Sequence, residues 1–317
     1  MASHSSQDDL VSIVVPVYRS AEILPELVAT IADVMSGRRV ELILVCDASP
    51  DNSWSVIRDL TKQYAFIEGI CLRKNAGQHN AIMAGLAHSR GDVVVAMDDD
   101  LQHPPSAIPQ LLAALGNGAD VCYVNYIQRK HAFWKRVGSK FNDVAATLLL
   151  GKPNNLYLSS FKAMRRPIVE QVLKYDGPFA YVDGLVLEAT SAITSVDIIH
   201  SERRSGEGTY SLRRSVSLWL KMATSFSVFP LRVLFVFGAL VALISMLVIL
   251  YVVFSKFHNP DLPIGWASTI AAILFVGGVQ MLGLGLLGEY LGRAYMKLNG
   301  KPQYVVREII SSSRTVR

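Results

Sequence analysis

The chain has 317 residues, of which 51% are hydrophobic, and a formal net charge of +5, so it is longer than one average domain. The modest charge and the lack of a Lys/Arg tract interleaved with aromatic residues argue against a nucleic-acid-binding protein. Residues 1–228 have the composition of a soluble α/β protein, whereas nearly all later positions up to Leu287 are uncharged and apolar.

The N-terminal residues 1–10 are polar and acidic, which excludes a secretory signal and predicts a disordered lead-in. Three cysteines, Cys46, Cys71 and Cys122, lie within apolar, strand-like runs and have no Cys-x-x-Cys spacing. We therefore expect them to be reduced core residues of a cytoplasmic domain.

Strands and helices are predicted to alternate through the first hundred residues. Predicted strands are 11–17, 40–45, 67–72 and 93–97, and predicted helices are 21–35, a segment after Ser53, and 81–88. This alternation predicts an α/β fold with a doubly wound, mostly parallel sheet. Ligands of such sheets bind beyond the carboxyl ends of the strands, where Asp47, Lys74 and Asp98 fall.

Three consecutive aspartates, Asp98, Asp99 and Asp100, end the strand 93–97. In an extended backbone Asp98 and Asp100 project to one side and Asp99 to the other. The pair is suited to Mg²⁺ or Mn²⁺, which binds one or two carboxylates and keeps positions open for substrate phosphates. The alternative is a solvated acidic turn that caps a helix starting near Pro104.

Four motifs in order resemble family-2 glycosyltransferases of GT-A (Rossmann-like) fold. They are Val-Pro-Val-Tyr at 15–18, Asp-Ala-Ser-Pro-Asp-Asn-Ser at 47–53, Asn-Ala-Gly-Gln-His-Asn at 75–80 and Asp-Asp-Asp-Leu-Gln-His-Pro-Pro at 98–105. The sequence around Gln78 and Gln102 resembles that of the polyprenyl-phosphate branch, which includes dolichyl-phosphate mannose synthase and bacterial undecaprenyl-phosphate sugar transferases. The resemblance implies an inverting sugar transfer from a nucleotide sugar, with UDP-sugar favoured, and a divalent ion.

Carried over position by position, the resemblance assigns two groups of residues. Nucleotide-sugar contacts fall on Pro16, Tyr18, Asp47, Lys74, Gln78, Asp98 and Asp99, and metal and diphosphate contacts on Asp98, Asp100 and Gln102, with Asp100 also a catalytic candidate. Asp47 can accept an imide N–H of the base, and Lys74 can offset phosphate charge. The alternatives are an Asx-turn for Asp47 and a solvated surface side chain for Lys74.

The chain also departs from the family pattern. Arg19-Ser20 stands where members often have Asn-Glu, and Leu156 stands where many relatives carry an aspartate that is a candidate general base. A base is not required, because a lipid phosphate is already an anion near neutral pH. If a base acts, Asp183 is the candidate, and its alternative role is to cap a helix.

Phosphate contacts are predicted from polar and basic segments between the sheet and the apolar region. The candidates for donor or lipid phosphate are Arg129, Ser160, Lys162, Arg203, Tyr210 and Ser211, several of them in the glycine-containing loop 200–211. The stretches 133–150 and 212–228 mix aromatic, basic and apolar residues, which is typical of helices in the headgroup plane. Ordinary amphipathic helices packed on the core are the alternative.

Two uncharged apolar runs, of 22 residues at Val233–Phe254 and 24 at Ile264–Leu287, are each long enough for a transmembrane helix. Basic residues flank the pair, so the positive-inside rule puts both termini and the catalytic domain in the cytoplasm of an inner-membrane protein. The second run is rich in glycine, which predicts an oligomer, and the resemblance implies a tetramer. Intrachain packing is the alternative, and the segment after Lys301 predicts a further strand.

These observations predict five parts: a lead-in at 1–10, a catalytic domain at 11–211, an interfacial helix at 212–228, a transmembrane hairpin at 229–292 and a cytoplasmic tail at 293–317. We expect a membrane-bound glycosyltransferase with a polyprenyl phosphate acceptor. Three alternatives are a nucleotide-sugar-binding protein without activity, a processive polysaccharide synthase and a small transporter. The synthase is disfavoured because no Gln-x-x-Arg-Trp motif occurs, and the transporter because neither apolar run contains a charge.

Overall fold

The computed structural model describes residues 9–126, 156–177, 180–198, 229–258 and 265–311. Chain contacts divide the protein into two compact units. The first comprises Met1–Tyr210 together with Gly300–Arg317, and the second comprises Ser211–Asn299. The first unit therefore takes residues from both sides of the second.

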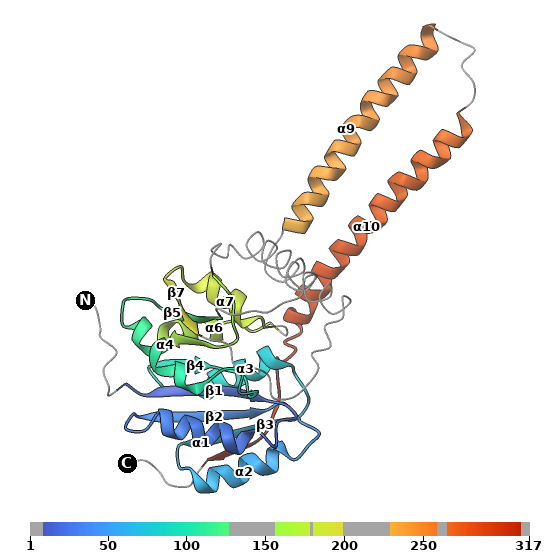
Figure 1. Cartoon of the computed structure of the whole chain (residues 1–317). Coiled ribbons are helices and arrows are strands. Elements are labelled where there is room, and N and C mark those ends of the chain that lie inside the picture. The colour runs from blue at the N-terminus through green and yellow to red at the C-terminus, as the bar shows by residue number, and fades with distance from the viewer. Residues whose placement is uncertain (1–8, 127–155, 178–179, 199–228, 259–264, 312–317) are drawn as a thin grey trace. The chain divides into compact units, whose positions relative to one another are not determined.

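A single mixed sheet forms the centre of the first unit (Figure 1). Its described strands are β1 (Val11–Val17), β2 (Val40–Cys46), β3 (Ile67–Leu72), β4 (Val93–Ala96), β5 (Val121–Tyr126), β6 (Lys162–Arg165), β7 (Ile193–Ile198) and β8 (Val306–Ser311), in the order β7-β5-β6-β4-β1-β2-β3-β8. Strands β4, β1, β2 and β3 are parallel, as are β5 and β7, whereas β6 and β8 run antiparallel to their neighbours. The predicted mostly parallel α/β sheet is confirmed.

Helices cover both faces of this sheet (Figure 1). One layer contains α1 (Leu24–Val34), α2 (Ser53–Gln63), a short 3₁₀ turn (Pro105–Ala107) and α4 (Ile108–Leu115), and the other contains α3 (Gln78–His88), α6 (Arg166–Leu173) and α7 (Val182–Ala189). Alternate residues of β1 serve the two layers: Ile13 and Val15 join the core under α1, while Val14 faces α3. A Cβ on Gly85 would lie 2.3 Å from Val14 Cγ1, so glycine permits the close packing of α3 on β1.

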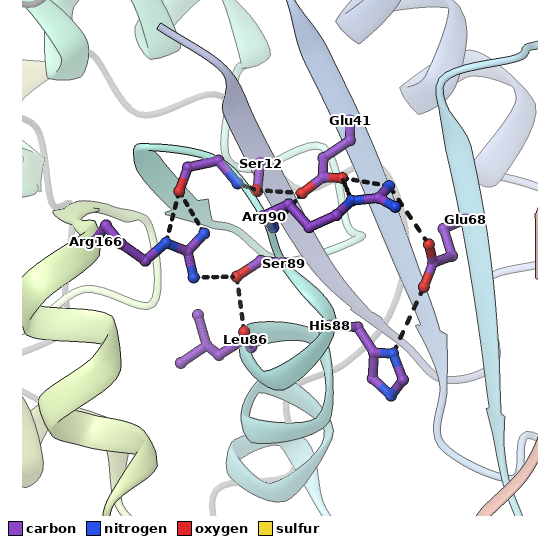
Figure 2. Close-up of polar contacts among 9 residues, drawn as sticks. Ser12, Glu41, Glu68, Leu86, His88, Ser89, Arg90 and Arg166 are labelled. Atoms are coloured by element: carbon purple, nitrogen blue, oxygen red, sulfur yellow. Dashed lines mark hydrogen bonds and ion pairs between the residues drawn. The ribbon is translucent and has the colours of Figure 1, made fainter. Parts of the chain in front are cut away.

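Polar side chains link the amino-terminal ends of the parallel strands (Figure 2). Glu41 is buried and accepts hydrogen bonds from Ser12 Oγ at 2.6 Å and Arg90 Nε at 2.8 Å. Arg90 also lies 3.7 Å from Glu68, and Arg166 donates to the carbonyl of Gly91. This network fixes the edge of the sheet opposite the strands' carboxyl ends.

The second unit contains two long helices, α9 (Phe229–His258) and α10 (Trp266–Leu298), which include the first apolar run of the sequence and the second from Trp266 onward. Large apolar side chains are exposed along both, among them Phe235 at 76% and Leu291 at 72%. Within the described part of the chain, no helix is long and apolar enough to cross a membrane. A Cβ on Gly283 of α10 would lie 3.3 Å from Leu234 of α9, an intrachain contact of the kind that glycine favours.

The chain returns to the sheet after α10. Strand β8 pairs antiparallel with β3, so the strand predicted for the tail is confirmed. The three cysteines are free and buried in strands, as their apolar surroundings predicted.

Candidate functional site

Backbone strain collects at the carboxyl edge of the sheet. In the ranges that the structure describes, three non-glycine residues have positive φ, Arg19 at 59°, Ala48 at 48° and Leu101 at 56°, and they follow β1, β2 and β4. L-residues rarely adopt this conformation, and strained backbone is most often retained where function requires it. The positive φ values therefore indicate a functional site in the loops after these strands.

Asp98 lies at the centre of this edge, held by side chains from two other segments. Gln78 Nε2, at the start of α3, donates to Asp98 Oδ1 at 2.6 Å. Ser160 Oγ, just before β6, donates to Asp98 Oδ2 at 2.6 Å. The backbone N–H of Asp98 donates to His103 Nδ1 at 3.1 Å, so the carboxylate and its backbone are both fixed.

Asp99 turns toward the loop after β1 instead. Its Oδ2 accepts from Ser20 Oγ at 2.5 Å and from the Tyr18 N–H at 3.1 Å. Burial raises the pKa of Asp99 to about 6, the charges of Asp98 and Asp100 add to the rise, and the two hydrogen bonds partly offset it. Asp99 thus ties two strand-end loops together.

Asp98 and Asp100 supply the oxygen ligands that a hard divalent cation prefers. Asp100 Oδ1 accepts the Gln102 N–H at 3.1 Å, which fixes the turn that carries it. Among the described residues, no group of three or more His, Cys, Asp or Glu side chains is arranged to enclose a metal ion. Two carboxylates fit Mg²⁺ or Mn²⁺, which in nucleotide sites completes its coordination with water and substrate phosphates.

Asp47 is buried, and its two carboxylate oxygens hold the turn before α3. Oδ1 accepts the Ala76 N–H at 2.7 Å and Oδ2 accepts the Gly77 N–H at 2.9 Å. Gly77 has a φ of 87°, which glycine adopts at no steric cost. Lys74, in the same turn, is exposed. The structure therefore gives Asp47 a contact with a turn 29 and 30 positions away, which differs from the Asx-turn that the sequence analysis gave as the alternative to a base contact.

Lys162 and Asp183 form a buried ion pair. Asp183, in the first turn of α7, also accepts from Tyr123 Oη at 3.1 Å. Lys162 Nζ lies 3.4 Å from the carbonyl of Ser159 and 5.4 Å from the centre of the Tyr123 ring. The sequence analysis had predicted a phosphate contact for Lys162 and a general base for Asp183, and the structure pairs the two with each other. Leu156 is buried.

The remaining predicted residues fall into two groups. Pro16 is paired with Val45 between β1 and β2, and Tyr18 is 45% exposed, with the Arg19 guanidinium 5.5 Å from its ring centre. Arg129, Arg203, Tyr210 and Ser211 lie outside the described residues, as do the stretches 133–150 and 212–228.

Sequence reasoning missed the supporting residues Ser20, His103 and Tyr123. The position of His103 within the Asp98–Pro105 motif was the only available signal.

Comparison with known proteins identifies the family. Residues 12–173 match glycosyl transferase family 2, and residues 229–294 match the GtrB C-terminal hairpin. The chain belongs to glycosyl transferase family 2. The family assignment makes it a glycosyltransferase, and the carboxyl edge that carries Asp98 lies within the matched region.

Two relatives match over nearly their whole length. An undecaprenyl-phosphate 4-deoxy-4-formamido-L-arabinose transferase of Shewanella sediminis (strain HAW-EB3) is 34% identical, covering 98% of this chain and 96% of that protein. The protein of the same name from Enterobacter sp. (strain 638) is 34% identical over 95% of this chain and 94% of its own length. The similarity therefore includes the helical hairpin as well as the sheet.

Solved structures agree with the fold. A mycobacterial protein superimposes with a TM-score of 0.52 at 20% identity, covering 68% of this chain and 73% of that one. Glucosyl-3-phosphoglycerate synthase from Mycobacterium tuberculosis, solved with Mn²⁺, UDP and phosphoglyceric acid, gives a TM-score of 0.51 at 20% identity, covering 68% and 76%. At this identity the comparison shows the GT-A fold of the first unit.

Proposed function

We propose that this glycosyltransferase moves a sugar from a nucleoside diphosphate sugar to a polyprenyl phosphate at a membrane. The assignment of a polyprenyl phosphate as the acceptor rests on the 34% identity to undecaprenyl-phosphate sugar transferases over 98% of the chain. The donor site is supported by the carboxyl edge, where Gln78 at the start of α3 holds Asp98 and Asp100 follows two residues later. A UDP-sugar donor is also consistent with a fold neighbour solved with UDP.

A divalent cation, Mg²⁺ or Mn²⁺, would be held by Asp98 and Asp100. When bound, such an ion neutralises negative charge on the leaving diphosphate. Gln78 and Ser160 hold Asp98 by both oxygens, and the Gln102 N–H holds Asp100, so this chain fixes the two carboxylates before substrate arrives. Preorganised ligands reduce the reorganisation needed during reaction.

The acceptor phosphate needs no strong general base from the protein. A phosphate monoester carries at least one negative charge near neutral pH and can attack the anomeric carbon directly. This is consistent with the buried Leu156 at the position where an aspartate was expected. The protein's part is to place the two substrates next to each other.

The hairpin is proposed to hold the enzyme in contact with lipid at the inner membrane, with the first unit on the cytoplasmic side. Exposed apolar side chains along α9 and α10 form the kind of surface that membranes or partners cover. Arg232 before the first apolar run and Arg293, Lys297 and Lys301 after the second are cations of the kind retained on the cytoplasmic side. An oligomer, with the glycines of α10 at its interface, is part of the same proposal.

The test combines transfer activity with membrane association. Membranes containing the full chain are incubated with undecaprenyl phosphate, Mn²⁺ and a panel of radiolabelled nucleotide sugars, and lipid-linked label is measured. One sugar should be transferred, Asp98→Ala should lower the rate at least about 10³-fold, and carbonate washing should leave the protein in the membrane. Asp59→Asn, an exposed aspartate of α2, is the matched control and should retain full activity.

Each failure has a distinct meaning. Nucleotide-sugar binding without transfer to any lipid would indicate a binding protein, and polymer formation would indicate a synthase. Unchanged transfer by Asp98→Ala would remove the proposed metal site, and complete extraction by carbonate would remove the proposed lipid contact.

A further inference from the structure

A buried lysine beside the candidate metal site requires an explanation. Lys162 is 1% exposed, and transferring an ammonium group from water to the protein interior costs several kcal/mol unless it is paired. Its partner Asp183 is also buried, at 6% exposed, so neither side chain is available to a large substrate without rearrangement. The pair forms outside the set of residues that contact Asp98 directly.

The pair does not contact Asp98 directly, but Lys162 lies on the strand next to the one that Asp98 follows. Lys162 is the first residue of β6, where it pairs in register with Ala96, the last residue of β4. It also pairs with Tyr123 of β5, whose hydroxyl donates to Asp183. The ion pair therefore joins β6, β5 and α7 at the point where β4 gives way to the aspartates.

The turn that precedes β6 connects the pair to Asp98. Lys162 Nζ lies 3.4 Å from the Ser159 carbonyl, and Ser159 Oγ accepts the Phe161 N–H at 3.2 Å. These two contacts fix the backbone on either side of Ser160. Ser160 Oγ in turn donates to Asp98 Oδ2 at 2.6 Å.

His79 is within electrostatic range of these groups. Its ring packs edge-on against Tyr181 at 4.9 Å, and Asp183, Lys162 and Asp98 all act on its charge. Burial lowers the pKa of His79, and the positive charge of Lys162 lowers it further, against the effect of the two carboxylates. Burial and the charge of Lys162 thus favour the uncharged form of His79.

Resting on the proposed function, we propose that Lys162 and Asp183 are positioning residues: their ion pair fixes the Ser159–Ser160 turn so that Ser160 holds Asp98 oriented for a divalent cation. Neither contacts substrate. Mutating a residue that orients a metal ligand commonly changes metal affinity by 10- to 100-fold. Lys162 and Asp183 act on the ligand Asp98 indirectly, through Ser160.

The test separates positioning from fold stability with a charge-free pair. Lys162→Met alone leaves Asp183 buried without its cation and should destabilise the protein strongly. The double variant Lys162→Met/Asp183→Asn removes both charges and retains an acceptor for Tyr123, so thermal stability should recover most of the loss. Its Mn²⁺ affinity, measured in the presence of UDP by electron paramagnetic resonance of free Mn²⁺, should still fall about tenfold.

A thermodynamic cycle with Ser160→Ala tests the route. Ser160→Ala should lower Mn²⁺ affinity by a similar factor, and combining it with the double variant should give about tenfold in total rather than about a hundredfold, because both changes break one chain of contacts. Arg90→Met, which breaks an ion pair at the opposite edge of the sheet, is the control for destabilisation and should leave Mn²⁺ affinity unchanged.

The outcomes are distinguishable. If the wild-type protein does not bind Mn²⁺ with UDP, the metal part of the proposed function fails. If the wild type binds Mn²⁺ but the charge-free variant binds it equally well, or if the effects of the variants are fully additive, the positioning role of the pair is overturned and the metal site remains.

Discussion

At the scale of single residues, the carboxylates of this protein act mainly on its own loops. Asp47 holds two backbone N–H groups of the turn before α3, and Asp99 joins the loops after β1 and β4. Asp51 accepts from Ser49, Ser53 and the Ala21 N–H; although burial alone raises its pKa, these hydrogen bonds lower it to about 2. The strained loops are thus held by aspartate carboxylates that accept hydrogen bonds from them.

Asp47→Asn tests this organising role. The amide presents an NH₂ group to one of the two backbone donors, which leaves a buried N–H unpaired and should destabilise the protein by about 1–3 kcal/mol. Because the turn also carries Lys74, the KM for the nucleotide sugar should rise, with a smaller change in kcat. Chemical denaturation and steady-state kinetics measure both. A variant with normal stability but no donor binding would show that Asp47 contacts the nucleotide and that the turn does not depend on it.

At the scale of elements, the sequence predicted those parts of the fold that local patterns determine. The strands that end at Val17, Cys46 and Leu72 were predicted because each is a short apolar run bounded by turn residues. The later strand β8, also predicted, has Arg307 and Glu308 among its apolar residues. The helix α3 begins at Gln78, earlier than predicted, because Gly77 and Asp47 organise its first turn.

The candidate site was only partly predictable. Asp98 and Asp100 stand together in the chain, so their shared role followed from the motif. Lys162 of β6 and Asp183 of α7 are 21 positions apart and meet only in the folded chain, and no local pattern signals this. Likewise, the contact of Ser160 with Asp98 spans 62 positions and depends on the pairing of β6 with β4.

The polar network at the amino edge gives the sheet a defined pH dependence (Figure 2). Burial opposes ionisation of Glu41, but hydrogen bonds from Ser12 and Arg90 and the charge of Arg90 outweigh it, so its pKa is lowered from 4.5. A carboxyl whose pKa is lower in the folded state adds stability above its unfolded pKa and loses it as the pH falls through the folded value. The contribution is therefore present at pH 7 and disappears on acidification below about pH 4.5.

Glu41→Gln should accordingly lower the free energy of unfolding at pH 7 by about 1 kcal/mol, a modest value because the Arg90 side chain is 68% exposed. Between pH 5 and about pH 3, the variant should lose less stability than the wild type. Urea denaturation across this range measures the difference, with Glu22→Gln on the exposed loop before α1 as the control. Parallel pH profiles for wild type and variant would show that Glu41 is not a source of the acid sensitivity.

At the scale of the whole molecule, the hairpin is inserted between two parts of one sheet. Strand β8 follows α10 in the chain and pairs with β3, and Glu308 contacts both Arg58 and Trp54 of α2. Just before β8, the Val305 carbonyl accepts the Arg73 N–H at 2.8 Å, at the start of the turn that Asp47 holds. The segment that leaves the hairpin therefore contributes directly to the loop proposed to bind the donor.

Two neighbouring substitutions in β8 test whether this returning strand supports the site. Ile310 packs against the core, with a Cβ on Gly69 only 2.8 Å from its Cγ1, whereas Ile309 is 46% exposed on the other face. Ile310→Asp should destabilise the first unit by about 2–5 kcal/mol, because it removes an apolar contact and buries a charge, and it should raise the KM for the nucleotide sugar. Ile309→Asp should leave both within experimental error, which controls for the added charge. If Ile310→Asp lowers the free energy of unfolding by less than the expected amount, or if the two variants behave alike, β8 is only an edge strand and the donor loop is held without it.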